Sequence, residues 1–191
     1  MDQALLLVLN TVFGLLTYSF LLRFMMQWLR APFRNPVGQA LVALTDWAVK
    51  PLRRVVPGLK GQDTSTLVLA WLAQFIWLLV ASIVVRRAAP DGGDAMTLSL
   101  YAVVELFKAA VWVLIVAVIV QAVLSWFGPE GPLAGFLNAM TFRFLAPIRR
   151  LVPPIGGTLD LSPLILIVLL QIVLTVPVPW IEGAVLSLFR G

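Results

Sequence analysis

Four uninterrupted apolar runs are the feature that most limits how this 191-residue chain can fold. An uncharged stretch of about 18 or more apolar residues can cross the roughly 30 Å hydrocarbon layer of a bilayer as an α-helix. The runs lie between Asp2 and Arg23, between Asp63 and Arg86, between Lys108 and Glu130, and between Asp160 and Glu182. We therefore expect an all-α membrane protein with four transmembrane helices. Because the chain starts MDQALLLVLN, with an acid where a signal peptide carries cations, we expect the first helix to be retained.

Composition argues against a soluble protein and against most catalytic chemistries. The chain is 61% hydrophobic and 12% charged, whereas a soluble domain carries about 25% charged residues. It contains no cysteine and no histidine, which removes thiolate nucleophiles, imidazole bases and the usual zinc sites. We therefore expect a protein that is not an enzyme and that binds no cofactor or metal.

The distribution of Lys and Arg predicts the orientation, since short cytoplasmic loops are enriched in these residues. The loops after the first and third runs are rich in cations, whereas the connector after the second run holds Arg86 and Arg87 together with Asp91 and Asp94. We expect the two long loops to face the cytoplasm and both termini to face the periplasm.

The two halves of the chain repeat one pattern. KPLRRVVP at 50–57 matches APIRRLVP at 146–153, a spacing of 96 residues. The predicted units are a first hairpin at 1–90, a periplasmic connector at 91–97 and a second hairpin at 98–191. Because each unit holds two spans, both have the same orientation and form a parallel repeat.

Each long loop carries an amphipathic helical pattern that begins at a proline, Pro36 or Pro132, and has Asn35 or Gly131 as its cap. We expect helices of about 15 residues, each ended by a proline. Their apolar stripes comprise Val37, Ala40, Leu41, Leu44, Trp47 and Ala48 in the first loop, and Leu133, Phe136, Leu137, Met140 and Phe144 in the second. Such helices fit the membrane interface, with Trp47 and Phe144 contacting lipid or a partner. The alternative is that they pack on the cytoplasmic end of the bundle.

Basic pairs follow these helices: Arg53 with Arg54, and Arg149 with Arg150. At the depth of lipid phosphates each cation gains about 1 kcal/mol from an anionic leaflet, so we expect anionic lipid to be a partner. A docking site for an acidic partner protein is the alternative.

An acid then precedes the second span of each hairpin. Asp63 and Asp160 are placed to cap that helix, together with Ser65 or Ser162, and to pair with the preceding arginines. We favour this structural Arg–Asp pairing over a catalytic acid.

Polar residues inside the spans are few. Gln74 and Gln171 occupy equivalent places in the second and fourth spans, where a central axis would bring their amides face to face. A polar constriction for water or an ion, lined also by Gln121 and Ser125, is the alternative. Arg23 is expected to extend toward the cytoplasmic face. Glu105 and Lys108 are expected to pair near the outer end of the third span, which leaves no acid at mid-depth.

The stretch APIRRLVPPIGGTLDLSP resembles the YggT (YlmG) family of small multi-pass membrane proteins. The matching residues of the second hairpin are Pro147, Arg149, Arg150, Pro153, Pro154, Gly156, Gly157, Asp160, Ser162 and Pro163, and those of the first include Pro51, Pro57 and Asp63. The first hairpin departs from the pattern at Gly58 and Thr66. The resemblance implies a bacterial inner-membrane protein without an established catalytic activity, linked to cell division, nucleoid distribution, membrane-complex assembly and osmotic stress.

Two functions remain open at this point. The first is a non-enzymatic scaffold or assembly factor whose basic loops bind the cytoplasmic leaflet and position other membrane or division proteins, with no direct contact with nucleic acid. The second is an osmotic-stress-related ion or solute pathway at the repeat axis. Four short helices could also require a second copy of the chain to cover their polar seam.

Overall fold

The structure is a computed structural model that describes residues 2–56, 58, 63–86, 92–127, 131–154 and 160–187. Its regular elements within these ranges are all α-helices, which confirms the expected fold class. They are α1 (Asp2–Trp28), α2 (Pro36–Leu52), α3 (Thr64–Arg86), α4 (Gly92–Phe127), α5 (Pro132–Leu151), α6 (Ser162–Thr175) and α7 (Pro177–Ser187).

Four segments are long and apolar enough to cross a membrane, as expected: Gln3–Trp28, Thr64–Val85, Gly92–Ser125 and Ser162–Ser187. The fourth is interrupted, because α6 ends at Thr175 and α7 begins at Pro177. Proline lacks the N–H that would continue the helical hydrogen bonds, and its ring clashes with the preceding turn. The last span is therefore two consecutive helical pieces.

The third span begins earlier than the charge pattern predicts. We expected Glu105 and Lys108 near its outer end, but α4 is one helix of 36 residues that starts at Gly92. At 1.5 Å per residue it is about 54 Å long, so Lys108 lies near its middle rather than at its outer end. The residues between Asp94 and Glu105 are mostly apolar helix formers, and they continue the helix outward.

The two loop helices begin where the sequence predicts and end later. In α2 the side chain of Asn35 accepts a hydrogen bond from the Gly38 N–H at 2.9 Å, whereas Gly131 has no side-chain cap to offer α5. The expected proline ends are wrong: Pro51 and Pro147 lie inside the helices. In α5 the turn after Pro147 is retained because Ile148 packs in a small core with Leu114 of α4 and Leu166 of α6.

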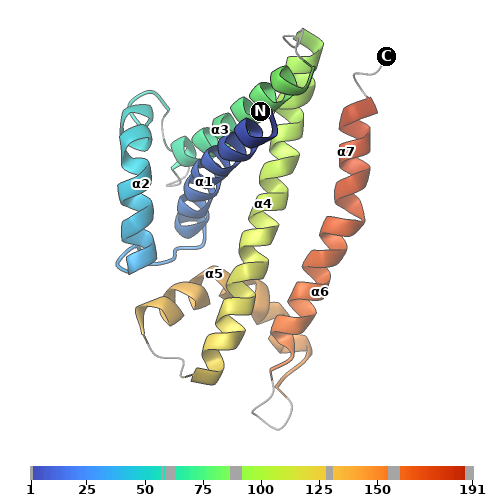
Figure 1. Cartoon of the computed structure of the whole chain (residues 1–191). Helices are drawn as coiled ribbons and strands as arrows, with labels where there is room; N and C mark the ends of the chain where they lie inside the picture. Colours follow the sequence, from blue (N-terminus) through green and yellow to red (C-terminus); the bar gives the residue numbers. More distant parts are fainter. Residues whose placement is uncertain are drawn as a thin grey trace.

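Helix α4 separates two groups of helices (Figure 1). On one side α1 packs against α3, and α2 packs on both; on the other side α6 and α7 pack on α4. Helix α5 begins on the side of α1 and α2, crosses α4 and packs on α4 and α6. In the same view α1 begins, and α7 ends, at the end of the molecule where α4 begins. Exposed apolar side chains cover the outer faces of the spans, such as Leu7, Val168 and Trp180, which is the surface expected against lipid.

The main core lies where the first group meets α4 and α5. Met26 of α1, Val49 of α2 and Met140 of α5 are fully buried there. Both loop helices therefore pack one face onto the spans, and the position of each is fixed relative to the bundle.

Candidate functional sites

The predicted Arg–Asp pairs form in both halves of the chain. Arg53 Nε donates a hydrogen bond to Asp63 Oδ2 at 2.6 Å, and Arg149 Nε donates to Asp160 Oδ2 at 2.9 Å. We call these pairs the Arg–Asp clamps. Each ties the end of a loop helix to the start of the following span.

The second carboxylate oxygen of each clamp caps that span. Asp63 Oδ1 accepts from the Ser65 N–H at 3.2 Å, and Asp160 Oδ1 accepts from the Ser162 N–H at 2.9 Å. Burial raises the pKa of Asp160, but the hydrogen bonds from Ser162 and Arg149 outweigh it and hold this pKa below its usual 3.8. The carboxylate is charged at neutral pH, where it offsets both the arginine and the helix N-terminus. Pro163 stands in the first turn of α6.

The two arginines of each pair have different surroundings. The first, Arg53 or Arg149, is held in a clamp, whereas the second, Arg54 or Arg150, is exposed. The other motif residues Pro51, Pro147, Pro153 and Pro154 are exposed too, and Pro57, Gly156 and Gly157 lie outside the described residues. The side chains of Arg54 and Arg150 are therefore not held by the clamps.

Helix α2 presents two different faces. Leu41, Thr45 and Val49 are buried against the spans. Leu44 and Trp47 point away from them, with 48% and 67% of their surface exposed. The side chain of Lys50 is exposed next to them. This outer face combines an aromatic ring, an aliphatic side chain and a cation.

Phe144 of α5 differs from Trp47. It is half-buried, and its ring lies edge-on to that of Trp28 at 6.5 Å between centroids. The exposed aromatic residue of α5 is Phe142, next to the exposed Arg143. Phe144 thus helps to join α5 to α1.

Arg23 holds α2 against α1, a role that the sequence analysis missed. It is 5% exposed, and its Nη1 donates to Thr45 Oγ1 at 2.6 Å and to Asp46 Oδ1 at 2.9 Å. Lys50 pairs with the other oxygen of Asp46 at 2.8 Å. Hydrogen bonds from Lys50 and Arg23 lower the pKa of Asp46, although burial opposes them. The available signal was Asp46 itself, the one acid between Asp2 and Asp63.

A related link without charges exists in the second half. Thr141, 96 residues after Thr45, donates its hydroxyl proton to Gln121 Oε1. Gln121 stands five residues before Trp126, as Arg23 stands five before Trp28. In both halves a polar side chain of a span therefore bonds a buried threonine of the loop helix.

The expected pairing of Gln74 with Gln171 is not found. Gln74 belongs to α3, which packs on α1, α2 and α4, whereas Gln171 belongs to α6, which packs on α4, α5 and α7. Figure 1 shows these two helices on different sides of α4. Gln121 and Ser125 line a separate cavity of about 250 Å³ against α5. Gln74, Gln171, Gln121 and Ser125 therefore do not line one common path for water or an ion.

A charged cluster lies inside the spans instead. Lys108 Nζ donates to Glu105 Oε1 of the same helix and to Glu182 Oε1 of α7, at 2.8 Å each. The expected pairing of Glu105 with Lys108 is confirmed. Glu182, which lies 74 residues after Lys108 in the chain, completes the cluster.

A polar cavity of about 490 Å³ lies beside this cluster, between α1, α3 and α4. We call it the intramembrane cavity. Its lining comprises Asn10, Gly14, Thr17, Tyr18, Gln74, Trp77, Leu78, Tyr101, Glu105, Lys108, Ala109 and Trp112.

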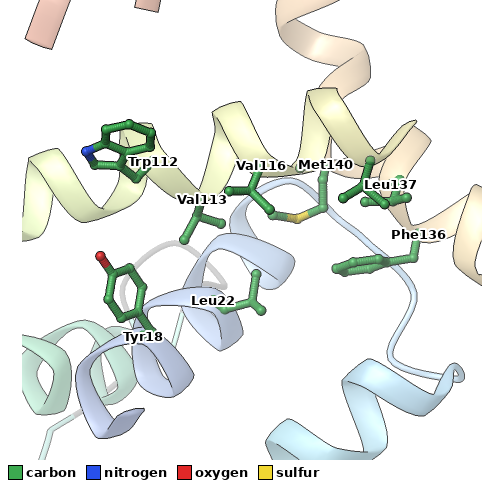
Figure 2. Close-up of a pocket in the computed structure, with 10 residues that line it drawn as sticks. Tyr18, Leu22, Trp112, Val113, Val116, Phe136, Leu137 and Met140 are labelled. Atoms are coloured by element: carbon green, nitrogen blue, oxygen red, sulfur yellow. The ribbon is translucent and has the colours of Figure 1, made fainter. Parts of the chain in front are cut away.

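A second, apolar cavity of about 480 Å³ adjoins it between α1, α4 and α5. Figure 2 shows Tyr18 and Trp112 at one end of it and Phe136 and Met140 toward the other. Tyr18 and Trp112 line both cavities. The chain thus has a hydrocarbon-lined space next to a polar one.

These features define a polytopic α-helical membrane protein with two clamped loop helices. The model of the CCB3/YggT family matches the chain twice, at residues 2–84 and 100–181. The YggT protein of Escherichia coli K12 is 36% identical over 167 residues, covering 87% of this chain and 85% of the relative. Protein PA0392 of Pseudomonas aeruginosa is 33% identical over 175 residues, covering 91% and 87%. A Vibrio alginolyticus protein encoded in the proC 3′ region is 32% identical over 166 residues, covering 86% and 88%. No solved structure matches the chain significantly.

The chain belongs to the CCB3/YggT family.

Proposed function

We propose that this protein is a non-enzymatic scaffold of the bacterial inner membrane whose loop helices bind the cytoplasmic leaflet and position partner proteins. The observation that carries the proposal is the outer face of α2, where Leu44 and Trp47 are exposed beside Lys50. A helix of this kind lies at the boundary between headgroups and acyl chains, with its cations toward the phosphates.

Electrostatics supports the same placement. Arg54 and Arg150 are exposed near the ends of the loop helices, Arg143 is exposed within α5, and all three add to Lys50. A cation at an anionic leaflet contributes about 1 kcal/mol, so four together favour anionic lipid strongly. Each clamp also fixes the end of its own loop helix to the following span.

The partners are proposed to be membrane proteins of cell division, nucleoid distribution or complex assembly, without direct binding of nucleic acid. A second copy of the chain is a further candidate. The alternative function, an ion or solute pathway at the repeat axis, has less support because Gln74 and Gln121 line different cavities.

Neutralising the two exposed arginines tests the proposal. We expect Arg54→Gln/Arg150→Gln to lose most of the anionic phospholipid that co-purifies with the protein, and most of its neighbours in proximity labelling, at unchanged thermal stability. The measurements are lipid mass spectrometry and labelling in cells. Two lost cations correspond to about 2 kcal/mol, or roughly 30-fold weaker attraction.

The matched control is Arg86→Gln/Arg87→Gln, which removes the same charge from the connector predicted to face the periplasm. It is expected to keep the lipid and the neighbours. An equal loss in the control would contradict the proposal, and flux through proteoliposomes that persists in Arg54→Gln/Arg150→Gln would favour the pathway instead.

A further inference from the structure

The proposed scaffold role leaves the intramembrane cavity between α1, α3 and α4 unused. We propose that this cavity binds a small organic cation of the alkylammonium class. This inference does not rest on the proposed function, because the cavity lies away from the outer face of α2 and from the clamps.

The charge of the cluster favours a cation. Glu105 and Glu182 contribute two carboxylates and Lys108 one ammonium, which leaves one net negative charge. In the low dielectric of the bilayer such a charge is costly unless it is paired. Glu105 and Lys108 both line the cavity, whereas Glu182 does not. Because Glu182 offsets the charge of Lys108, a cation bound in the cavity would lie close to the excess charge of Glu105.

The walls favour an organic cation over a metal ion. Four aromatic residues line the cavity: Tyr18, Trp77, Tyr101 and Trp112. The faces of such rings attract alkylammonium groups, which are weakly hydrated. A volume of about 490 Å³ is within the range of small-molecule sites and far larger than a bare ion needs.

The site lies toward the end of the molecule where α1 and α4 begin. Asn10 is about two turns from the start of α1, and Tyr101 is about two and a half turns from the start of α4. The clamps lie at the other ends of the spans, at the start of α3 and α6. A ligand would therefore approach from the end opposite to the clamps.

Titration of the purified full-length protein with tetramethylammonium chloride tests the proposal. We expect a saturable change in tryptophan fluorescence and a rise in Tm that sodium and potassium chloride do not produce at equal ionic strength. Gln74→Leu replaces an amide of the cavity wall with hydrocarbon and should weaken binding at least about tenfold, a change of about 1.4 kcal/mol. Glu105→Gln removes the excess charge and should weaken it similarly.

Gln171→Leu is the matched control, since it removes the equivalent amide of α6 and should bind as the unaltered protein does. The proposal is overturned if sodium gives the same response, if no response occurs, or if Gln74→Leu binds as tightly as Gln171→Leu. Because Gln74 makes no ion pair, its variant remains informative even where Glu105→Gln fails to fold.

Discussion

Replacing Lys108 with methionine is expected to destabilise the protein by about 3 kcal/mol. This is the lower end of the cost of removing one partner from a buried ion pair, because the three side chains are only partly buried. Lys108 lies between Glu105 and Glu182 with 2.8 Å contacts to both. Without it two carboxylates remain close together inside the spans, where water cannot screen them. The measurement is thermal unfolding of the purified protein in detergent.

A triple variant separates charge from packing. Lys108→Met/Glu105→Gln/Glu182→Gln removes all three charges, and replacement of a whole buried cluster is often neutral or stabilising. We expect it to recover most of the stability lost in Lys108→Met. The account is contradicted if Lys108→Met is as stable as the unaltered protein, or if the triple variant is no more stable than Lys108→Met. Either result would show that Lys108 does not offset the charges of the two glutamates.

Arg23→Leu is expected to loosen α2 from α1 and to lower stability by about 2–3 kcal/mol. The side chain is buried and holds both Thr45 and Asp46. The cost is smaller than for Lys108 because Asp46 keeps its pair with Lys50. Hydrogen exchange of the α2 amides, measured together with Tm, should show the loss concentrated in this helix.

Arg23→Gln is the informative comparison. In the second half of the chain the position related to Arg23 is Gln121, which is hydrogen-bonded to Thr141. A glutamine at position 23 can retain the bond to Thr45, so we expect a smaller loss than for Arg23→Leu. Equal effects of the two substitutions, or unchanged exchange in α2, would mean that Arg23 does not hold the helix.

The spans, caps and clamps could be predicted because each depends on neighbouring residues. Hydrophobic length marks a span, Asn35 precedes a helix, and Asp63 and Asp160 follow arginines by about ten residues in both halves. Local spacing is enough for these features, since the contacting groups are joined by a short loop.

The features that sequence reasoning missed depend on distant contacts. The sequence placed Glu105 and Lys108 together but not Glu182, which pairs with Lys108 from 74 residues further along the chain. The glutamine pairing assumed symmetric packing of the two hairpins, whereas α4 separates α3 from α6. Neither the Lys108–Glu182 pair nor the separation of α3 from α6 leaves a local pattern in the sequence.

A single cysteine at position 47 tests the central claim most directly, since the chain has no cysteine of its own. The account predicts that the free thiol of Trp47→Cys is modified by a membrane-impermeant reagent in inverted vesicles but not in intact spheroplasts. In a separate sample, a nitroxide attached to this cysteine should lie at the lipid headgroup boundary. Gly92→Cys at the start of α4 should show the reverse sidedness. Modification of Trp47→Cys from outside the cell, or a nitroxide as accessible to water as a free label, would contradict the account.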